Sequence, residues 1–157
     1  FRRVLFRSGL KVIPSLSYND YLQLIDMRKV IDGAACQYAA YNRTHKDLIS
    51  ISKYITMADT TNIKTFYEAD EAFHKAIYFA TKNRYFLKAY RMLNIDLARS
   101  KMYDIINGII TLQEKQFIIN EHEDIYNSIR NSNGHEAYKY GQKHVEIMAR
   151  TIELAYK

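Results

Sequence analysis

The stretch YEADEAFHKAIYFATKN, residues 67–83, sets the helical character of this chain and raises its main chemical question. Helical spacing places five residues of this stretch and its flank on one face: Phe66, Asp70, Phe73, His74 and Ile77. That face is apolar apart from one carboxylate and one imidazole. Because an unpaired buried carboxylate is costly, such a group is normally neutralised, paired or bound to an ion. The stretch therefore predicts a core-facing helix in which Asp70 has a specific partner.

The composition is that of one soluble globular domain. The chain has 157 residues, of which 48% are hydrophobic and 25% charged, and it can bury about two thirds of its unfolded surface. One proline and five glycines leave room for long helices. No apolar run reaches the ~18–20 residues of a membrane span, and the opening FRRVLFRSGLKVIP lacks the apolar core of a secretory signal. Cys36 is the single cysteine, so we expect no disulfide and a reducing, cytoplasmic location.

The net charge of +6 is concentrated at the N-terminus. Arg2, Arg3 and Arg7 supply three of these charges, which leaves +3 (6 minus 3) over the rest of the chain. That remainder is too diffuse to predict a nucleic-acid-binding surface. We divide the chain into an N-terminal tail, residues 1–14, and a helical domain, residues 15–157. The sequence leaves open whether residues 1–8 are native or were added by cloning or read-through.

Six amphipathic segments follow the tail, separated by short polar connectors and without any alternating strand pattern. Helices are expected over residues 17–42, 44–57, 63–82, 84–106 and 111–130, and from residue 133 onward. Polar N-caps with an acid three residues later mark three of the starts: Thr44 with Asp47, Thr111 with Glu114, and Asn133 with Glu136. The inward stripe of the first helix is expected at Leu24, Arg28, Ile31, Ala35 and Ala39. The fold prediction is therefore all-α, an antiparallel bundle of about six helices.

Two further helices also carry an inward histidine. One face of the fifth groups Ile118, His122, Ile125 and Ile129, and one face of the sixth groups Ala137, Tyr140, His144, Ile147 and Met148. A lone inward histidine is more often a hydrogen-bonded core residue than a ligand. Three of them together with an aspartate favour one shared divalent ion, held by Asp70, His74, His122 and His144. Imidazole nitrogens and a carboxylate oxygen suit zinc first, and also nickel, manganese or iron. His45 and His135 are expected to be solvated.

Arg28 is a second polar residue on an apolar stripe. It can form a salt bridge with Asp32 one turn later, or extend its charged end to the surface. Alternatively, its guanidinium can bind a ligand carboxylate. The residues alone leave these alternatives open.

Nearly the whole chain resembles the C-terminal ligand-sensing domain of the FadR subfamily of GntR-type transcriptional regulators. The segments that carry the resemblance are IDMRKVIDGAACQYAA, DEAFHKAI…TKN and EHEDIYNSIRN…HEAYKYGQKHV. Their landmarks are an acid-x-Arg (Asp26-Met27-Arg28, where the family more often has glutamate), an Asp-x-x-Phe-His followed by an asparagine (Asp70, Phe73, His74, Asn83), and a Glu-His followed by an alanine and a histidine (Glu121, His122, Ala137, His144). The combined spacing is specific, whereas each landmark alone is weak.

The resemblance implies the same metal ligands that helical spacing selects, a small carboxylate effector beside the metal, and a homodimer. Arg28 and Asn83 are the residues expected to contact the effector. The family's winged-helix DNA-binding domain would precede this region, and SGLKVIPSLS (residues 8–17) resembles its last wing strand and linker. The tail would then be a remnant of the winged-helix domain, and the regulator would act on DNA only through that upstream domain.

Two other functions remain open. One is a metal-dependent hydrolase on a helical bundle, in which the ion activates water. Such an enzyme needs a general base, and Glu121 is a poor candidate because it points about 100° away from its neighbour His122 on the helix. The other is a purely structural bundle with hydrogen-bonded core histidines. We expect a regulator without enzymatic activity.

Overall fold

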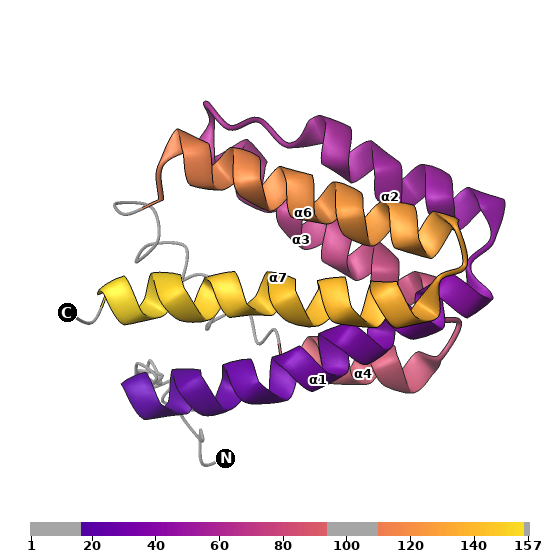
Figure 1. Cartoon of the computed structure of the whole chain (residues 1–157), viewed down its shortest axis with the longest axis horizontal. Helices are drawn as coiled ribbons and strands as arrows, with labels where there is room; N and C mark the ends of the chain where they lie inside the picture. Colours follow the sequence, from indigo (N-terminus) through magenta and orange to yellow (C-terminus); the bar gives the residue numbers. More distant parts are fainter. Residues whose placement is uncertain (1–16, 94–109, 156–157) are drawn as a thin grey trace, which may run out of the picture.

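The computed structural model describes residues 17–93 and 110–155, and this part of the chain is a bundle of α-helices (Figure 1). The helices are α1 (Tyr18–Asn42), α2 (His45–Met57), α3 (Ile63–Ala80), α4 (Arg84–Leu93), α6 (Leu112–Arg130) and α7 (Gly134–Ala155). The prediction of an all-α bundle is confirmed, and the predicted helix boundaries agree to within about two residues wherever the structure describes them. The N-terminal tail and the second half of the predicted fourth helix lie outside the described residues.

The order of packing brings α3, α6 and α7 around a common centre. α1 and α7 form the most extensive helix pair and run antiparallel, while α6 lies against α7, also antiparallel to it (Figure 1). α3 packs on both α1 and α2. The first residues of α1 and the last of α7 lie at the same end of the bundle. Side chains that point inward from α3, α6 and α7 therefore meet in the middle.

Capping residues fix the starts of most helices. The predicted caps at Thr44 and Thr111 are complete capping boxes, in which the threonine and the acid three residues later satisfy each other's backbone N–H. Asn133 Oδ1 accepts from the backbone N–H of Glu136 at 3.2 Å, as predicted. Ser17 and Asp20 form a further box, which the sequence analysis did not identify.

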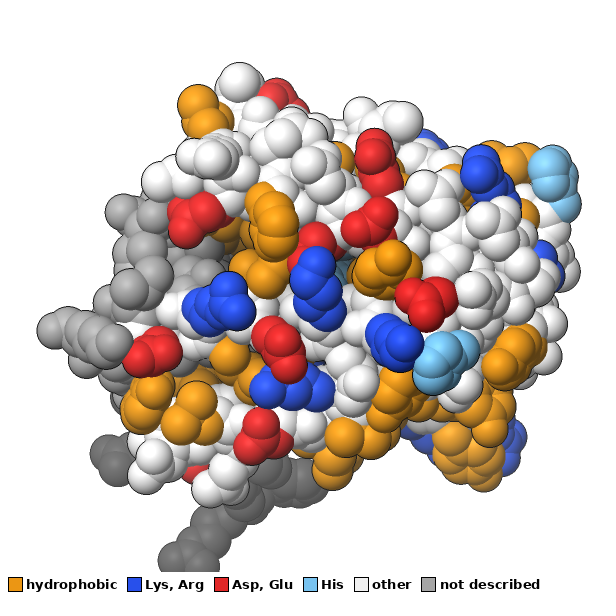
Figure 2. All heavy atoms as spheres, viewed as in Figure 1, with side chains coloured by type: hydrophobic (Ala, Val, Ile, Leu, Met, Phe, Trp, Pro, Cys, Tyr) orange, Lys and Arg blue, Asp and Glu red, His pale blue; other side chains and the backbone are white. Residues whose placement is uncertain are grey.

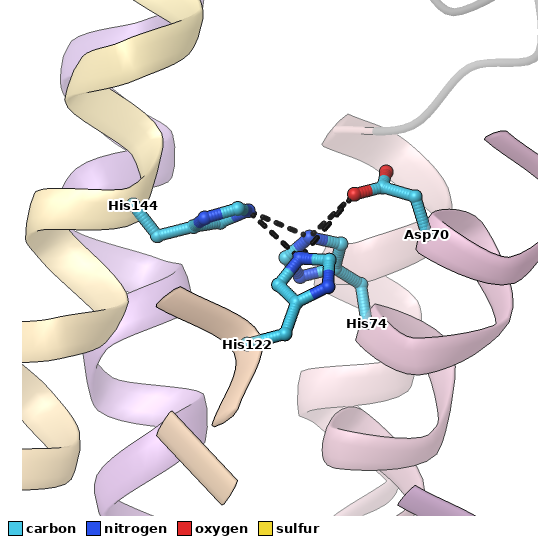
Figure 3. Close-up of side chains that lie close together, drawn as sticks. All are labelled: Asp70, His74, His122 and His144. Carbon is cyan, nitrogen blue, oxygen red and sulfur yellow. Dashed lines mark hydrogen bonds and ion pairs between the residues drawn. The ribbon is translucent and has the colours of Figure 1, made fainter. Parts of the chain in front are cut away.

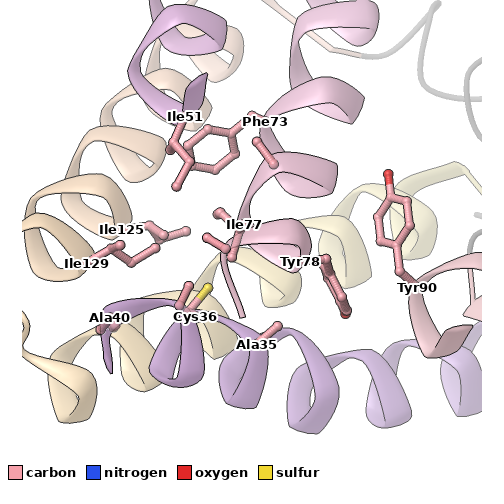
Figure 4. Close-up of a cluster of buried hydrophobic side chains, with 14 of the residues drawn as sticks. Ala35, Cys36, Ala40, Ile51, Phe73, Ile77, Tyr78, Tyr90, Ile125 and Ile129 are labelled. Carbon is pink, nitrogen blue, oxygen red and sulfur yellow. The ribbon is translucent and has the colours of Figure 1, made fainter. Parts of the chain in front are cut away.

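The apolar core joins α1, α2, α3 and α6 (Figure 4). Phe73 and Ile77 of α3 are fully buried against Ile51 of α2 and against Ile125 and Ile129 of α6. These contacts repeat at the spacing of one helical face, as the sequence predicts for α3 and α6. The core lies next to His74 and His122. His74 directly follows Phe73 in α3, and His122 precedes Ile125 in α6 by three residues, which is about one turn.

The buried stripe of α1 differs from the prediction. Arg28, Ala35 and Ala39 are buried as expected, but Leu24 and Ile31 are only half-buried. The stripe instead includes Tyr21, Ile25 and Asp32. The predicted stripe omitted Asp32 because an aspartate is normally solvated, whereas here Arg28 and Tyr78 provide its partners.

Two glycines allow α1 and α7 to approach closely. A Cβ on Gly141 would lie 2.8 Å from Cys36 Sγ and 3.1 Å from the Cα of Gly33. Neither position has room for a side chain, so the two backbones can pack against each other there. Gly141 precedes His144 by about one turn, and the close approach therefore also fixes how far His144 reaches into the bundle.

Candidate metal centre

Four side chains from three helices converge in the middle of the bundle (Figure 3). Asp70 and His74 come from α3, His122 from α6 and His144 from α7. One oxygen or nitrogen atom of each lies within 4.8 Å of the corresponding atoms of the others. The structure thus brings together all four residues that the sequence analysis proposed to share an ion, and it leaves His45 and His135 exposed, as expected.

The separations of the donor atoms fit a single small ion. The Nε2 atom of His144 lies 3.1 Å from that of His74 and 3.3 Å from that of His122. Asp70 Oδ1 lies 3.4 Å from His122 Nε2 and 3.7 Å from His74 Nε2. A tetrahedral ion with bonds of about 2.0–2.1 Å holds its ligands about 3.3–3.4 Å apart, so these residues fit a zinc-like ion in both chemistry and spacing.

The histidines are held in an environment that favours neutral imidazoles. Burial lowers the pKa of His122, and the hydrogen bond with Asp70 only partly opposes that effect. Burial also lowers the pKa of His144, against a partial opposing effect of Glu121. Burial alone would raise the pKa of Asp70, but the interactions with His122 and His74 hold it well below its usual range. A neutral imidazole and an ionised carboxylate are the forms that bind divalent ions.

Neighbouring side chains contact two of the rings. His144 Nδ1 lies 3.2 Å from Glu121 Oε2, and both side chains are buried. When Nδ1 carries the proton and donates to this carboxylate, Nε2 keeps its lone pair toward the cluster. The imidazole of His122 stacks on the ring of Phe73, with centroids 4.0 Å apart and 22° between the planes. His144 and His122 therefore each contact a residue outside the four-residue cluster, in addition to their contacts within it.

Arg28 forms the salt bridge that the sequence analysis gave as one alternative. Its Nε and Nη2 donate to Asp32 Oδ2 at 3.1 and 2.9 Å, and both side chains are buried. Tyr78 donates its hydroxyl to the other oxygen of Asp32. Although burial opposes it, the charge of Asp32 keeps the pKa of Arg28 raised, and the Asp70 carboxylate adds to this effect. Arg28 thus belongs to a buried network with Asp32 and Tyr78.

Asn83 occupies a different place. It follows the end of α3, where its Oδ1 accepts from the backbone N–H of Tyr85 at 2.9 Å at the start of α4. Its own backbone N–H donates to Thr81 Oγ1 at 3.1 Å. These contacts are those of a helix cap, and the predicted effector contact of Asn83 stays a prediction.

Three residues of this region have roles that were not predicted from the sequence. Asp32 was considered only as a partner of Arg28, Tyr78 was not considered, and Glu121 was considered as a landmark of the resemblance and as a catalytic base, but not as a partner of His144. The helical position of Tyr78, one turn after His74, was the one available signal for its place near the centre. The contact of Glu121 with His144 had no local signal, because it joins two helices.

On the face in view, basic and acidic side chains are interspersed rather than gathered by sign (Figure 2). Among the helices that the structure describes, none combines the length and the apolar character that crossing a membrane requires.

Comparison with known proteins identifies the family. Residues 23–147 match the FCD domain, which is well over half of the chain. A curated relative, the Uxu operon regulator of Haemophilus influenzae, is 24% identical over 137 residues, covering 85% of this chain and 52% of the relative. The chain thus spans about half the length of the curated relative it matches. Because the FCD match covers well over half of its residues, the chain belongs to the FCD domain family and is an FCD-type regulator domain.

Proposed function

We propose that the chain is the sensor domain of a bacterial transcriptional regulator, and that it binds one divalent ion and a small organic acid. The observation that carries this proposal is the convergence of Asp70, His74, His122 and His144 within 4.8 Å, in a domain of a regulator family. When bound, the ion supplies a Lewis-acidic centre that can take a carboxylate oxygen as a further ligand. Zinc is the ion that the donor set favours, with nickel, manganese and iron as alternatives.

The side chains of the cluster indicate where an effector reaches the ion. The Asp70 side chain is 21% exposed, whereas those of the three histidines are 8% exposed or less. Access is therefore on the Asp70 side of the cluster. Although burial opposes it, the charges of Asp32 and Asp70 keep the pKa of Arg28 raised, and we expect the guanidinium to add to the positive potential there. A carboxylate that binds the ion would be attracted both by the ion and by the Arg28 guanidinium.

The regulator would act on DNA through an upstream winged-helix domain, as a homodimer in the cytoplasm. The relative named as an operon regulator is about twice as long as the matched region, which leaves room for such a domain in a full-length protein. An effector that binds one arrangement of the DNA-binding domains more tightly would shift the population toward it. The direction of the response, repression or activation, follows from which arrangement the effector favours.

A metal-dependent hydrolase remains the alternative, and the geometry of Glu121 weighs against it. Glu121 contacts Nδ1 of His144, on the edge of the imidazole away from the Nε2 atom that faces the cluster. A general base must reach the water that it activates. Glu121 lies behind a ligand instead, and the regulator family supports a binding domain without catalysis.

Metal analysis of the purified protein tests the centre. We expect about one divalent ion per chain, and we expect His122→Ala and His144→Ala to lose it, because each removes one of four ligands. His45→Ala and His135→Ala are matched controls, since both side chains are exposed and outside the cluster. Elemental analysis that finds the ion retained in both cluster variants would show that the ligands are other residues.

Calorimetric titration of the metal-loaded protein with a panel of mono- and dicarboxylates tests the effector. Arg28→Ala should weaken the best hit by about 2–4 kcal/mol, as when one partner of a buried charge pair is removed, while the metal content stays the same. Lys29→Ala is the control, because it removes a neighbouring cation that is less buried. Equal affinity in Arg28→Ala and the parent would leave Arg28 with only the structural role it has beside Asp32.

A further inference from the structure

We propose that Glu121 is a positioning residue of the metal centre: it holds His144 through Nδ1 so that Nε2 faces the ion. This inference rests on the proposed metal site and adds a partner behind one of its ligands. Glu121 Oε2 lies 3.2 Å from His144 Nδ1, and the two side chains are 6% and 7% exposed. A buried carboxylate that accepts from a ligand imidazole fixes the tautomer and the orientation of the ring.

Both nitrogens of His144 have a role in this arrangement. Nε2 lies 3.1 Å from His74 Nε2 and 3.3 Å from His122 Nε2, at the middle of the cluster. A neutral imidazole carries its one proton on a single nitrogen. With that proton on Nδ1, donated to Glu121, Nε2 has a lone pair available for the ion, whereas the other tautomer would place a proton in the centre.

The second oxygen of Glu121 is poorly satisfied in the protein alone. Glu121 Oε1 is buried and has no hydrogen-bond partner, and its nearest described cation is Lys143 Nζ at 3.5 Å. The Lys143 side chain is 57% exposed, so solvent weakens its attraction for the carboxylate. A buried carboxylate with so little compensation is costly unless another positive charge is near. A divalent ion on the far side of His144 would provide that charge.

The effect should be specific to one ligand. On α6, Glu121 and His122 are adjacent and point about 100° apart. The same turn of this helix therefore supplies one ligand, His122, and the residue that contacts a second ligand, His144 of α7. His122 is oriented by its stack on Phe73 instead. Replacing Glu121 should therefore disturb His144 and leave His122 in place.

The test measures Zn²⁺ affinity of the whole chain by competition with a chromophoric chelator, together with the visible spectrum of the Co²⁺ form. Glu121→Ala should weaken Zn²⁺ binding toward the upper end of about 10–100-fold and alter the Co²⁺ spectrum. Glu121→Gln keeps an acceptor oxygen and the size of the side chain, so we expect a loss near the lower end of that range. If Glu121→Ala does not fold, Glu121→Gln still tests the role of Glu121.

Two controls separate positioning from ordinary ion pairing. Lys143→Gln removes the cation beside Glu121 without touching His144, and Zn²⁺ affinity should change by no more than about fivefold. Glu123→Gln, at an exposed position of the same helix, should have no effect on affinity or spectrum. Equal losses in Lys143→Gln and Glu121→Gln, or parental affinity in Glu121→Gln, would overturn the inference while the metal site stands. A parent chain that binds neither Zn²⁺ nor Co²⁺ would overturn the site and this inference with it.

Discussion

Replacing Asp32 should destabilise the fold strongly, although the residue is a surface-type side chain. Asp32→Leu leaves the Arg28 guanidinium without the carboxylate that now accepts from it at 2.9 and 3.1 Å, and it removes the acceptor of the Tyr78 hydroxyl. The side chains of Arg28 and Asp32 are 5% and 7% exposed, so water cannot replace the lost partner without disrupting the packing.

The expected magnitude follows from that burial. Breaking a buried ion pair by removing one partner costs about 3–5 kcal/mol. A hydroxyl that loses its buried acceptor costs about 1–3 kcal/mol on its own, but the two effects share one site and do not simply add. We therefore expect a loss of about 3–5 kcal/mol, a large fraction of the total of about 5–15 kcal/mol for a domain.

Urea unfolding in the presence of a chelator measures this cost without a contribution from bound metal. The cycle comprises the parent, Arg28→Met, Asp32→Leu and the double variant. Because removing both charges avoids leaving the buried Arg28 charge without the Asp32 carboxylate, the double variant should be at least about 2 kcal/mol more stable than Asp32→Leu alone. The exposed pair Lys64–Glu68 has the same i,i+4 spacing, and its matched cycle should give a coupling of only about 0.3–0.5 kcal/mol.

The outcome decides whether the pair is buried in solution as it is in the structure. If Asp32→Leu costs less than about 1 kcal/mol, or if its coupling with Arg28 equals that of the exposed pair, the reasoning from burial is wrong. Arg28 would then be held loosely, and its role would have to be judged from effector binding alone.

The remaining predictions concern pH, packing and assembly. Because burial lowers the pKa values of His122 and His144, the unfolded chain takes up protons first as the pH falls below about 6.5; stability and Zn²⁺ affinity should both decline from there downward, and unfolding and chelator competition at pH 7.5 and 5.5 should show it. Gly141→Ala should cost about 1–3 kcal/mol in urea unfolding, because the new Cβ would meet Cys36 Sγ at 2.8 Å; an increase in stability, usual for glycine to alanine in a helix, would contradict the close packing. Light scattering at micromolar concentration should give a homodimer rather than the 18.5 kDa monomer, and a monomer at every concentration would count against that state.

The sequence by itself determined the helices and the inward direction of the four cluster residues. Asp70, His74, His122 and His144 each lie on the apolar face of their own helix, and that face is a local property with a period of 3.6 residues. The caps at Thr44 and Thr111 are local for the same reason, since a cap and its partner are three residues apart. Such features need no knowledge of which helices become neighbours.

Tertiary packing decided the partners of the polar groups. Asp32 is buried only because Tyr78, from another helix, joins Arg28 around it, and a helical wheel of α1 alone would place an aspartate in water. Glu121 points away from His122, and its carboxylate meets the His144 imidazole only because α7 packs against α6. Periodicity shows which way a side chain points, but the free energy of burying its charge depends on atoms that are distant in the chain and meet only in the folded bundle.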